Sequence, residues 1–265
     1  MVTRSYIDRF FLFRWVMEKY LGIFKRYIDE NYDLENPLVK LKYYHTLRVV
    51  DLMKDLVNRL GLSEDEKRLA IFIALFHDLG RFYEAKLNKQ FSNVNFDHAY
   101  LSNFILFYEG FIKNFPIKEE EYEIIKKAIF YHNKIEIGRE LNPEARLFAM
   151  YIRDVDKIDI LKVISENHLE FNAIPSKKIL TNYYKQESID VHDIRSSSSD
   201  KIILYLSFYD QLYTPEAKEI LNEKGYMEDF ICSVKLNENE KINNYFYDLI
   251  DHYRRGNFYK KRKKR

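Results

Sequence analysis

The chain has 265 residues, of which 46% are hydrophobic, and this share excludes a disordered protein. Its 7 glycines and 5 prolines provide too few turn residues for an all-β architecture, so an all-α fold is expected. The formal net charge of +2 excludes a global electrostatic attraction to nucleic acid or to a membrane, and the single cysteine, Cys232, excludes an intrachain disulfide.

Two helices are predicted in the first part of the chain. Apolar and aromatic side chains recur at helical spacing over residues 5–31, which indicates an amphipathic helix. Pro37 is typical of the first turn of a helix, because the N–H group that it lacks would have no partner there. We therefore expect a second helix that begins at Pro37 and carries His45 in the segment YYHTLRVV.

The next segment is predicted to be a buried helix that ends in two titratable residues. Ser63, with Glu66 three residues later, forms the pattern of a capping box, and the residues that follow are apolar on nearly every side. His77 and Asp78 end this apolar run, and Gly80 is expected to stop the helix. Burying two such side chains costs free energy unless a partner such as a metal ion compensates for it.

Two further helices are predicted to carry histidines. Asp97 can cap a helix from His98 to about Phe111, which places His98 in its first turn. The three glutamates at 119–121 favour the N-terminus of a helix that ends at His132, because the helix dipole stabilises negative charge there. His98 is therefore expected at the start of one helix and His132 at the end of another.

An acidic helix is predicted from Pro143 to about Ser165, and it contains Asp154, Asp156 and Asp159. Asp154 and Asp156 are two residues apart, so their side chains point to nearly opposite sides of a helix. Each of them shares a stripe with apolar residues. Helical periodicity therefore leaves open which of the two faces the other candidate residues.

The C-terminal region contains two polar breaks. The segment SSSSD at 196–200 is predicted to be a loop, with Ser199 or Asp200 capping the helix KIILYLSFYDQLY. The apolar face of this helix is expected to pack on the preceding helices or on a second copy in a homo-oligomer. LNENEK at 236–241 precedes a final predicted helix, INNYFYDLIDHYRRG.

Six residues on the predicted helices form an ordered set of metal-ligand types. Neutral imidazole and carboxylate together are donors that divalent transition metals accept, and such a site can make hydroxide from water at neutral pH. The candidate ligands are His45, His77, Asp78, His98, His132 and Asp156. The remaining histidines lack such a context and are expected at the surface: His168, His192 and His252.

The segment LFHDLGRF and the ending DVDKIDIL resemble the HD superfamily of metal-dependent phosphohydrolases. The stretches GRFYEAK, FSNVNFDHAYLSNFIL and YHNK also resemble a bacterial subgroup of HD-domain proteins, and the match covers roughly residues 40–165. The resemblance selects Asp156 over Asp154 as the ligand, because only Asp156 aligns with the end of the family signature. That signature is a lone His, an adjacent His-Asp pair and a distal Asp, which here are His45, His77, Asp78 and Asp156.

The resemblance implies an HD helical bundle with additional N- and C-terminal helices. No repeat and no long linker divides the chain, so we expect one all-helical domain over residues 1–265. Its HD core would cover about 36–165, and a C-terminal helical extension would cover about 166–265.

The resemblance also implies a metal-dependent phosphohydrolase, in which hydroxide held by the metal attacks phosphorus. In members with two metals, His98 and His132 correspond to ligands of the second ion, and Asp78 bridges. Arg81 and Lys157 are expected to stabilise charge on the phosphoryl oxygens. Imidazole with carboxylate favours one or two ions of Mn, Fe, Co, Ni or Zn. The expected substrate is a small phosphoester, such as a nucleotide or a nucleotide-derived compound.

Two other functions stay open. Some relatives use a di-iron form of this scaffold to oxidise a substrate with oxygen. The chain could instead be a catalytically silent module that binds a nucleotide, although no position of the signature is missing.

The location and the remaining partners follow from charge and hydropathy. No apolar run is long enough to span a bilayer, and the first residues, MVTRSYIDRFFLFRW, lack a small-residue cleavage site. With the single cysteine, these features predict a cytoplasmic protein without a membrane partner. The basic tail KKRKKR at 260–265 is expected to be a solvated end rather than a nucleic-acid arm.

Overall fold

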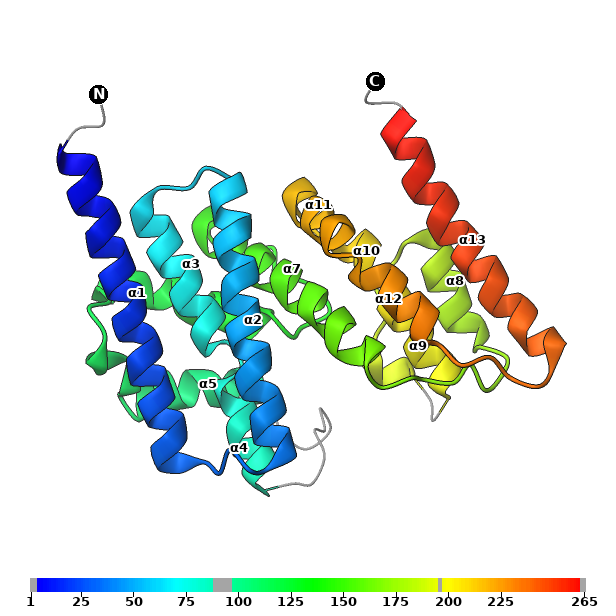
Figure 1. Ribbon diagram of the computed structural model, residues 1–265, viewed down its shortest axis with the longest axis horizontal. Helices are drawn as coiled ribbons and strands as arrows, with labels where there is room; N and C mark the ends of the chain where they lie inside the picture. The colour runs from blue at the N-terminus through cyan, green and yellow to red at the C-terminus, as the bar shows by residue number, and fades with distance from the viewer. Residues whose placement is uncertain (1–3, 88–96, 195–196, 263–265) are drawn as a thin grey trace. The chain divides into compact units, whose positions relative to one another are not determined.

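The computed structural model describes residues 4–87, 97–194 and 197–262; in the two end helices it describes side chains only from Trp15 onward and up to Arg255. These residues form helices and no strand, apart from one parallel bridge between Glu170 and Lys235, which confirms the all-α fold. None of the described helices is both long and apolar enough to cross a membrane. Contacts group the chain into two compact units, residues 1–156 and 157–265 (Figure 1).

The first unit contains the elements that position the candidate ligands. The final helix of this series, α7, continues past the boundary at residue 156 into the second unit. In chain order the elements are α1 (Arg4–Asn31), α2 (Pro37–Arg59), α3 (Glu64–Phe76), α4 (Leu79–Leu87), α5 (His98–Asn103), the π-helix η1 (Phe104–Tyr108), the 3₁₀ helices η2 (Phe111–Asn114) and η3 (Glu119–Glu121), α6 (Tyr122–Tyr131) and α7 (Pro143–Ser165).

The predicted helix starts in this unit are confirmed. Pro37 is the first residue of α2, and the side chain of Asn36 caps that helix by accepting from the N–H of Leu38 at 2.9 Å. Ser63 and Glu66 make the reciprocal bonds of a capping box at the start of α3. These local bonds satisfy N–H groups that have no partner within the helix.

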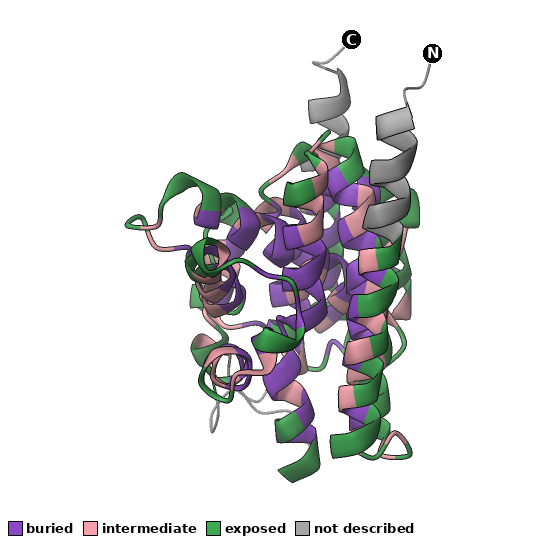
Figure 2. Ribbon diagram, turned by 90° about the vertical axis from the view of Figure 1, so that its left-hand side faces the viewer, coloured by how far each residue is buried: buried purple, intermediate pink, exposed green. Residues whose placement is uncertain are grey.

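Aromatic side chains fill much of the core of the first unit. Tyr20 and Phe24 of α1 are fully buried, and their rings meet those of Phe72 and Phe76 on α3 edge to face, with centroids 5.6 and 6.0 Å apart. Most helices carry both buried and exposed positions, whereas residues 69–76 of α3 are all buried (Figure 2). The many aromatic residues therefore serve packing, since edge-to-face pairs stabilise a core beyond the area that they bury.

Gly80 does not stop α3, and this prediction was wrong. The helix ends at Phe76, and Gly80 is the second residue of α4, with no left-handed backbone conformation. A Cβ atom at position 80 would overlap the carbonyl oxygen of His98 and lie 2.9 Å from the Cβ of Leu101. The glycine is therefore needed because α4 and α5 approach each other closely there.

The helix predicted from His98 to about Phe111 is shorter and irregular. Asp97 caps it as expected, because its carboxylate accepts from the N–H groups of Ala99 and Tyr100. The α-helix continues only to Asn103, and a π-helical turn then extends to Tyr108. Such turns insert an extra residue, which changes the directions of the side chains that follow.

The second unit is a set of shorter helices followed by one long helix. Its predicted cap was wrong: Ser197 is the N-cap of α9, and the carboxylate of Asp200 instead accepts from the N–H of Ser176 at 2.9 Å. Ser199 likewise bonds outside its helix, to the N–H of Ala173 at 3.0 Å. The elements are α8 (Lys177–Lys185), η4 (Val191–Asp193), α9 (Ser198–Leu206), α10 (Phe208–Gln211), α11 (Pro215–Lys224), α12 (Tyr226–Ser233) and α13 (Glu240–Arg262).

Two predictions about this region stay open. The arrangement as one domain, with an HD core over about 36–165 and an extension over about 166–265, stays a prediction beside the division of contacts at residue 156. The basic tail at 260–265 lies outside the residues whose side chains are described.

Of the three remaining histidines, His168 and His192 are exposed, whereas His252 is half-buried between the rings of Tyr183 and Tyr184.

Candidate metal centre

The six candidate ligands come together within the first unit, from three helices, the C-caps of two more helices and one turn. The turn between α3 and α4 holds Asp78, next to His77 at the C-cap of α3. The four histidines and Asp78 are all at most 5% exposed, and the side chain of Asp156 is 15% exposed. Groups of these side chains place one ligand atom each within 4.8 Å of one another, a spacing that suits a shared ion: His45 with His77 and Asp78, His77 with His132 and Asp156, and Asp78 with His98 and His132.

One carboxylate oxygen of Asp78 faces the signature residues. Its Oδ2 atom lies 3.6 Å from Nε2 of His45 and 3.8 Å from Nε2 of His77. Oδ1 of Asp156 lies 3.2 and 3.7 Å from the same two nitrogens. Two imidazoles and two carboxylates therefore surround one point.

The other carboxylate oxygen of Asp78 faces a separate pair of histidines. Its Oδ1 atom lies 3.5 Å from Nε2 of His98 and 3.5 Å from Nε2 of His132. These two nitrogens are 3.1 Å apart. Asp78 thus stands between two groups of donors and presents one oxygen to each.

The backbone fixes the direction of two of the imidazole rings. Nδ1 of His77 donates to the carbonyl oxygen of Ala74 at 2.8 Å, and Nδ1 of His132 donates to that of Ile129 at 2.6 Å. In a neutral ring this leaves the lone pair on Nε2, the atom that faces the carboxylates. Nε2 of His77 is buried and has no hydrogen-bond partner in the described part of the chain. A buried acceptor of this kind costs free energy, and a metal ion would satisfy it.

The charges of the site favour a cation. Burial alone would raise the pKa of Asp78, but Lys42 and the surrounding histidines outweigh it and hold this pKa well below its usual value. For Asp156 burial is likewise outweighed, by His45 and His77, and the pKa is again well below its usual value. Burial also lowers the pKa of His98 and that of His132. At neutral pH the carboxylates are therefore anionic and these imidazoles neutral, the forms that bind metals.

Lys42 is a charged residue of the site that sequence reasoning missed. Its Nζ atom lies 2.6 Å from Oδ2 of Asp78, and the lysine side chain is 15% exposed. Lys42 precedes His45 by three residues on α2, so both side chains lie on one face of that helix. This spacing was the available signal, but a lysine three residues from a histidine is too common a pattern to be informative alone.

The predicted catalytic cations have other partners. Nη1 of Arg81 forms an ion pair with the fully buried Glu84 at 2.7 Å, and Arg81 also lowers the pKa of His98 through its charge. Lys157 belongs to the second unit, where its Nζ atom lies 4.5 Å from the centre of the Phe208 ring. Roles for Arg81 and Lys157 in catalysis stay predictions.

The two alternative aspartates of α7 differ in their surroundings. The side chain of Asp156 points to His45 and His77, as the alignment with the family signature required. Asp154 takes no part in the groups of candidate ligands among the described residues, yet it is fully buried. Asp154 therefore does not face solvent, and a structural role for it stays a prediction.

A buried serine holds the histidine-bearing segments together. Oγ of Ser102 accepts from the N–H of Gly80 at 2.9 Å and is 2.8 Å from the carbonyl oxygen of His77 and 2.9 Å from that of His98. The segment before α4 and the start of α5 are thereby joined at the position where Gly80 allows close approach. Sequence reasoning missed Ser102 because two of its three partners are backbone atoms more than twenty residues away.

Arg153 performs a similar task on α7. Its guanidinium donates to the carbonyl oxygens of Tyr131 at 2.8 Å and Ile135 at 3.1 Å, and also to that of Lys134. These carbonyls follow the last turn of α6, where His132 is the C-cap residue. Arg153 therefore ties the helix that carries Asp156 to the turn that carries His132.

Comparison with known families agrees with this geometry. Residues 43–162 match the family model described as HD domain. This interval contains all six candidate ligands. Searches of curated proteins and of solved structures found no match.

Proposed function

The chain belongs to the HD superfamily of metal-dependent phosphohydrolases, and we propose that it hydrolyses a small phosphoester with one or two bound divalent transition metals. The observation that supports this most is the position of Asp78, whose Oδ2 faces one pair of histidines while its Oδ1 faces another. A bridging carboxylate between two groups of donors is the arrangement that a two-metal hydrolytic site requires.

The ligand sets follow from the two sides of Asp78. His45, His77 and Asp156 would hold the first ion with Oδ2 of Asp78, and His98 and His132 would hold the second ion with Oδ1. Imidazole and carboxylate donors favour Mn, Fe, Co, Ni or Zn. When bound, such ions supply an activated water and positive charge for the phosphoryl oxygens.

Residues of the chain itself prepare this site in three ways. The carboxylates of Asp78 and Asp156 supply buried negative charge, and hydrogen bonds to the backbone orient His77 and His132. Burial of the four histidines and Asp78 limits contact with bulk water, which strengthens the electrostatic interactions among them. Lys42, on the side of Oδ2, is in addition a candidate for contact with a substrate phosphate.

The substrate proposed is a nucleotide or a nucleotide-derived phosphoester, in line with the chemistry of the superfamily. An oxidative reaction at a di-iron form of the site is the alternative, since the same donors would hold iron. A nucleotide-binding module without turnover is the third reading. The measured products distinguish the three.

The test begins with elemental analysis of the purified protein. Metal-free protein is then reconstituted with each of Mn, Fe, Co, Ni and Zn. Phosphate release is measured from nucleoside mono-, di- and triphosphates and from phosphomonoesters, and hydrolysis of cyclic nucleotides is measured through the nucleoside monophosphate that it yields. Asp51→Asn is the matched control, because Asp51 lies on the same helix as His45 with its side chain 74% exposed. Phosphate release that requires metal supports the proposal. Oxygen consumption without hydrolysis, or nucleotide binding without either, contradicts it.

A further inference from the structure

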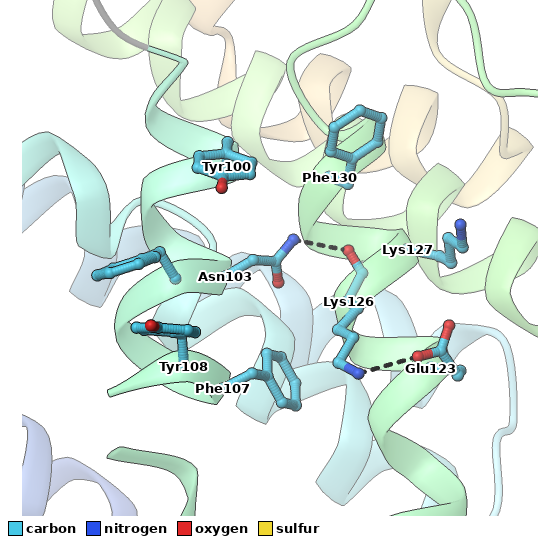
Figure 3. Close-up of a pocket in the computed structure, with 9 residues that line it drawn as sticks. Tyr100, Asn103, Phe107, Tyr108, Glu123, Lys126, Lys127 and Phe130 are labelled. Carbon is cyan, nitrogen blue, oxygen red and sulfur yellow. Dashed lines mark hydrogen bonds and ion pairs between the residues drawn. The ribbon is translucent and has the colours of Figure 1, made fainter. Parts of the chain in front are cut away.

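A cavity lies beside α5, which begins with His98, and α6, which His132 follows. It has a volume of about 420 Å³ and lies between the α5–η1 segment and α6 (Figure 3). His98 is 4% exposed, whereas Tyr100 in the cavity wall is 63% exposed. Residues two positions apart point to nearly opposite sides of a helix, so the cavity opens on the solvent side, away from the candidate metal centre.

The walls of the cavity are mainly aromatic. The rings of Phe104 and Tyr108 are stacked, with centroids 4.6 Å apart and planes inclined by 23°. This pair spans the π-helical turn, in which the N–H of Glu109 donates to the carbonyl oxygen of Phe104 at 3.0 Å. The aromatic residues that line the cavity are Tyr100, Phe104, Phe107, Tyr108 and Phe130.

An unsatisfied acceptor is part of the lining. Nδ2 of Asn103 donates to the carbonyl oxygen of Lys126 at 2.9 Å, so the side chain reaches from α5 to α6 (Figure 3). Because that carbonyl can only accept, the remaining amide atom, Oδ1, is an acceptor. It is buried and has no hydrogen-bond partner in the described structure. Because this atom is covered, an N–H group of a ligand would satisfy it once the side chains that cover it move aside.

The charged residues of the lining favour an anion. Nζ of Lys126 forms an ion pair with Glu123 at 2.9 Å and lies 5.0 Å from the centre of the Phe107 ring. Lys127, which is exposed, adds a second ammonium group. Two cations and one carboxylate therefore line the opening, and a phosphate group would meet a net positive charge there.

We propose that this cavity is a binding site for a nucleoside monophosphate, separate from the candidate metal centre. The base would stack on the aromatic wall and offer an N–H to Oδ1 of Asn103, and its phosphate would face Lys126 and Lys127. The volume lies within the range of small-molecule sites, and base stacking on aromatic side chains does not depend on a particular base. This binding site is inferred independently of the proposed hydrolytic function.

The ligand chemistry is tested by calorimetric titration of the full chain with AMP, GMP, CMP and UMP. At least one of the four is expected to bind. Its nucleoside alone and ribose 5-phosphate alone should each bind about tenfold more weakly or worse, because stacking and charge both contribute. Absence of binding by all four, or equally strong binding of ribose 5-phosphate, would overturn the proposal.

The location is tested with two surface variants and a matched control. Tyr108→Ala and Lys127→Glu change exposed residues, so the fold is retained, and each should weaken binding by about tenfold. Tyr247→Ala changes a tyrosine that is 52% exposed outside the cavity and should leave the affinity unchanged. Binding that persists in both cavity variants would place the nucleotide elsewhere, for example at the metal centre, and overturn the assignment.

Photo-crosslinking identifies the occupant of the cavity directly. The 8-azido derivative of AMP is expected to label the peptide that contains Phe104 and Tyr108. Labelling confined to other peptides would contradict the proposal. An increase in the molecular mass in solution with protein concentration, abolished by Tyr108→Ala, would also contradict the proposal. The cavity wall would then be an interface between copies of the chain.

Discussion

The two sides of Asp78 differ in charge and in the number of donors. On the side of Oδ2, a second carboxylate from Asp156 faces the same two imidazoles, and the ammonium group of Lys42 is 2.6 Å away. On the side of Oδ1, the only candidate donors among the described residues are the imidazoles of His98 and His132. The side of Oδ2 thus has four donors, which carry two negative charges. The side of Oδ1 has three donors, and their only negative charge is that of Asp78, which both sides share.

This difference predicts the order in which two ions would bind. Affinity for a divalent cation rises with the number and the charge of the donors, so the side of Asp156 is expected to bind its ion more tightly than the side of His98. The nitrogens of His98 and His132, 3.1 Å apart, can also share a proton when no ion is present. Changes at the site test this contrast, from the largest expected effect to the smallest.

Asp78→Ala removes the one residue that both sides share. We expect the loss of essentially all bound metal and a decrease in phosphate release of about 10³-fold or more, because both ions lose a charged donor. Elemental analysis and an activity assay measure the two effects, with Asp51→Asn as control. A full complement of metal in Asp78→Ala would contradict the assignment.

Asp156→Asn should affect only the side of Oδ2. Replacing the carboxylate of Asp156 by an amide should lower metal affinity by about 100-fold and abolish most turnover. Asp154→Asn, two residues away on the same helix and more deeply buried, should keep most of both. The opposite outcome would show that the alignment with the family signature is displaced by two residues.

His98→Ala and His132→Ala should chiefly affect the side of Oδ1, although His132 also lies near His77 and Asp156. Each is expected to lower the metal content by about one ion per chain and to reduce hydrolysis, while the ion near Asp156 stays bound. Circular dichroism checks that the fold is retained. Unchanged metal content combined with a higher KM would make these histidines contacts for the substrate phosphate.

Lys42→Met tests the competition for Oδ2. The ammonium group of Lys42 and an ion would share this oxygen, so its removal should tighten the first metal site by about tenfold. The metal-free variant should unfold at a lower temperature, because the buried charge of Asp78 loses a partner. Lys42→Arg keeps the charge and serves as control. Weaker metal binding in Lys42→Met would show that Lys42 supports the ion instead.

Glu66→Gln tests a small, local effect away from the site. The hydroxyl and N–H of Ser63 bond to the carboxylate of Glu66 and lower its pKa below the usual 4.5. The stabilisation from this carboxylate is therefore present above pH 4.5 and is lost as the pH falls through the lower folded value. Wild type should exceed Glu66→Gln in stability by about 0.5 kcal/mol at pH 7 in urea titrations, with a shrinking difference toward pH 3. A constant difference would contradict the cap.

Local signals predicted the fold well where a few neighbouring residues decide the structure. Pro37 and the pair Ser63-Glu66 mark helix starts because their partners lie within one turn. The role of Gly80 was predicted wrongly because only a glycine fits beside the carbonyl of His98, which is distant in sequence. Asp200 was misread for the same reason, since its partner is an N–H in another segment.

The candidate site was predictable to the extent that its residue types are rare. Seven histidines in the chain made an ordered set visible, and the structure places all the chosen members together. Lys42, Ser102 and Arg153 escaped because lysine, serine and arginine are common and their roles depend on contacts between helices. The choice between Asp154 and Asp156 needed the family signature, because two apolar stripes on α7 were equally plausible.

Anomalous diffraction from crystals of the full chain grown with Mn²⁺ tests the central claim most directly. Two peaks are expected beside Asp78, one facing Oδ2 with His45, His77 and Asp156, and one facing Oδ1 with His98 and His132. The first peak should persist at lower Mn²⁺ concentration than the second. No peak beside Asp78, or a single peak that excludes Oδ1 at saturating Mn²⁺, would contradict a carboxylate shared by two ions.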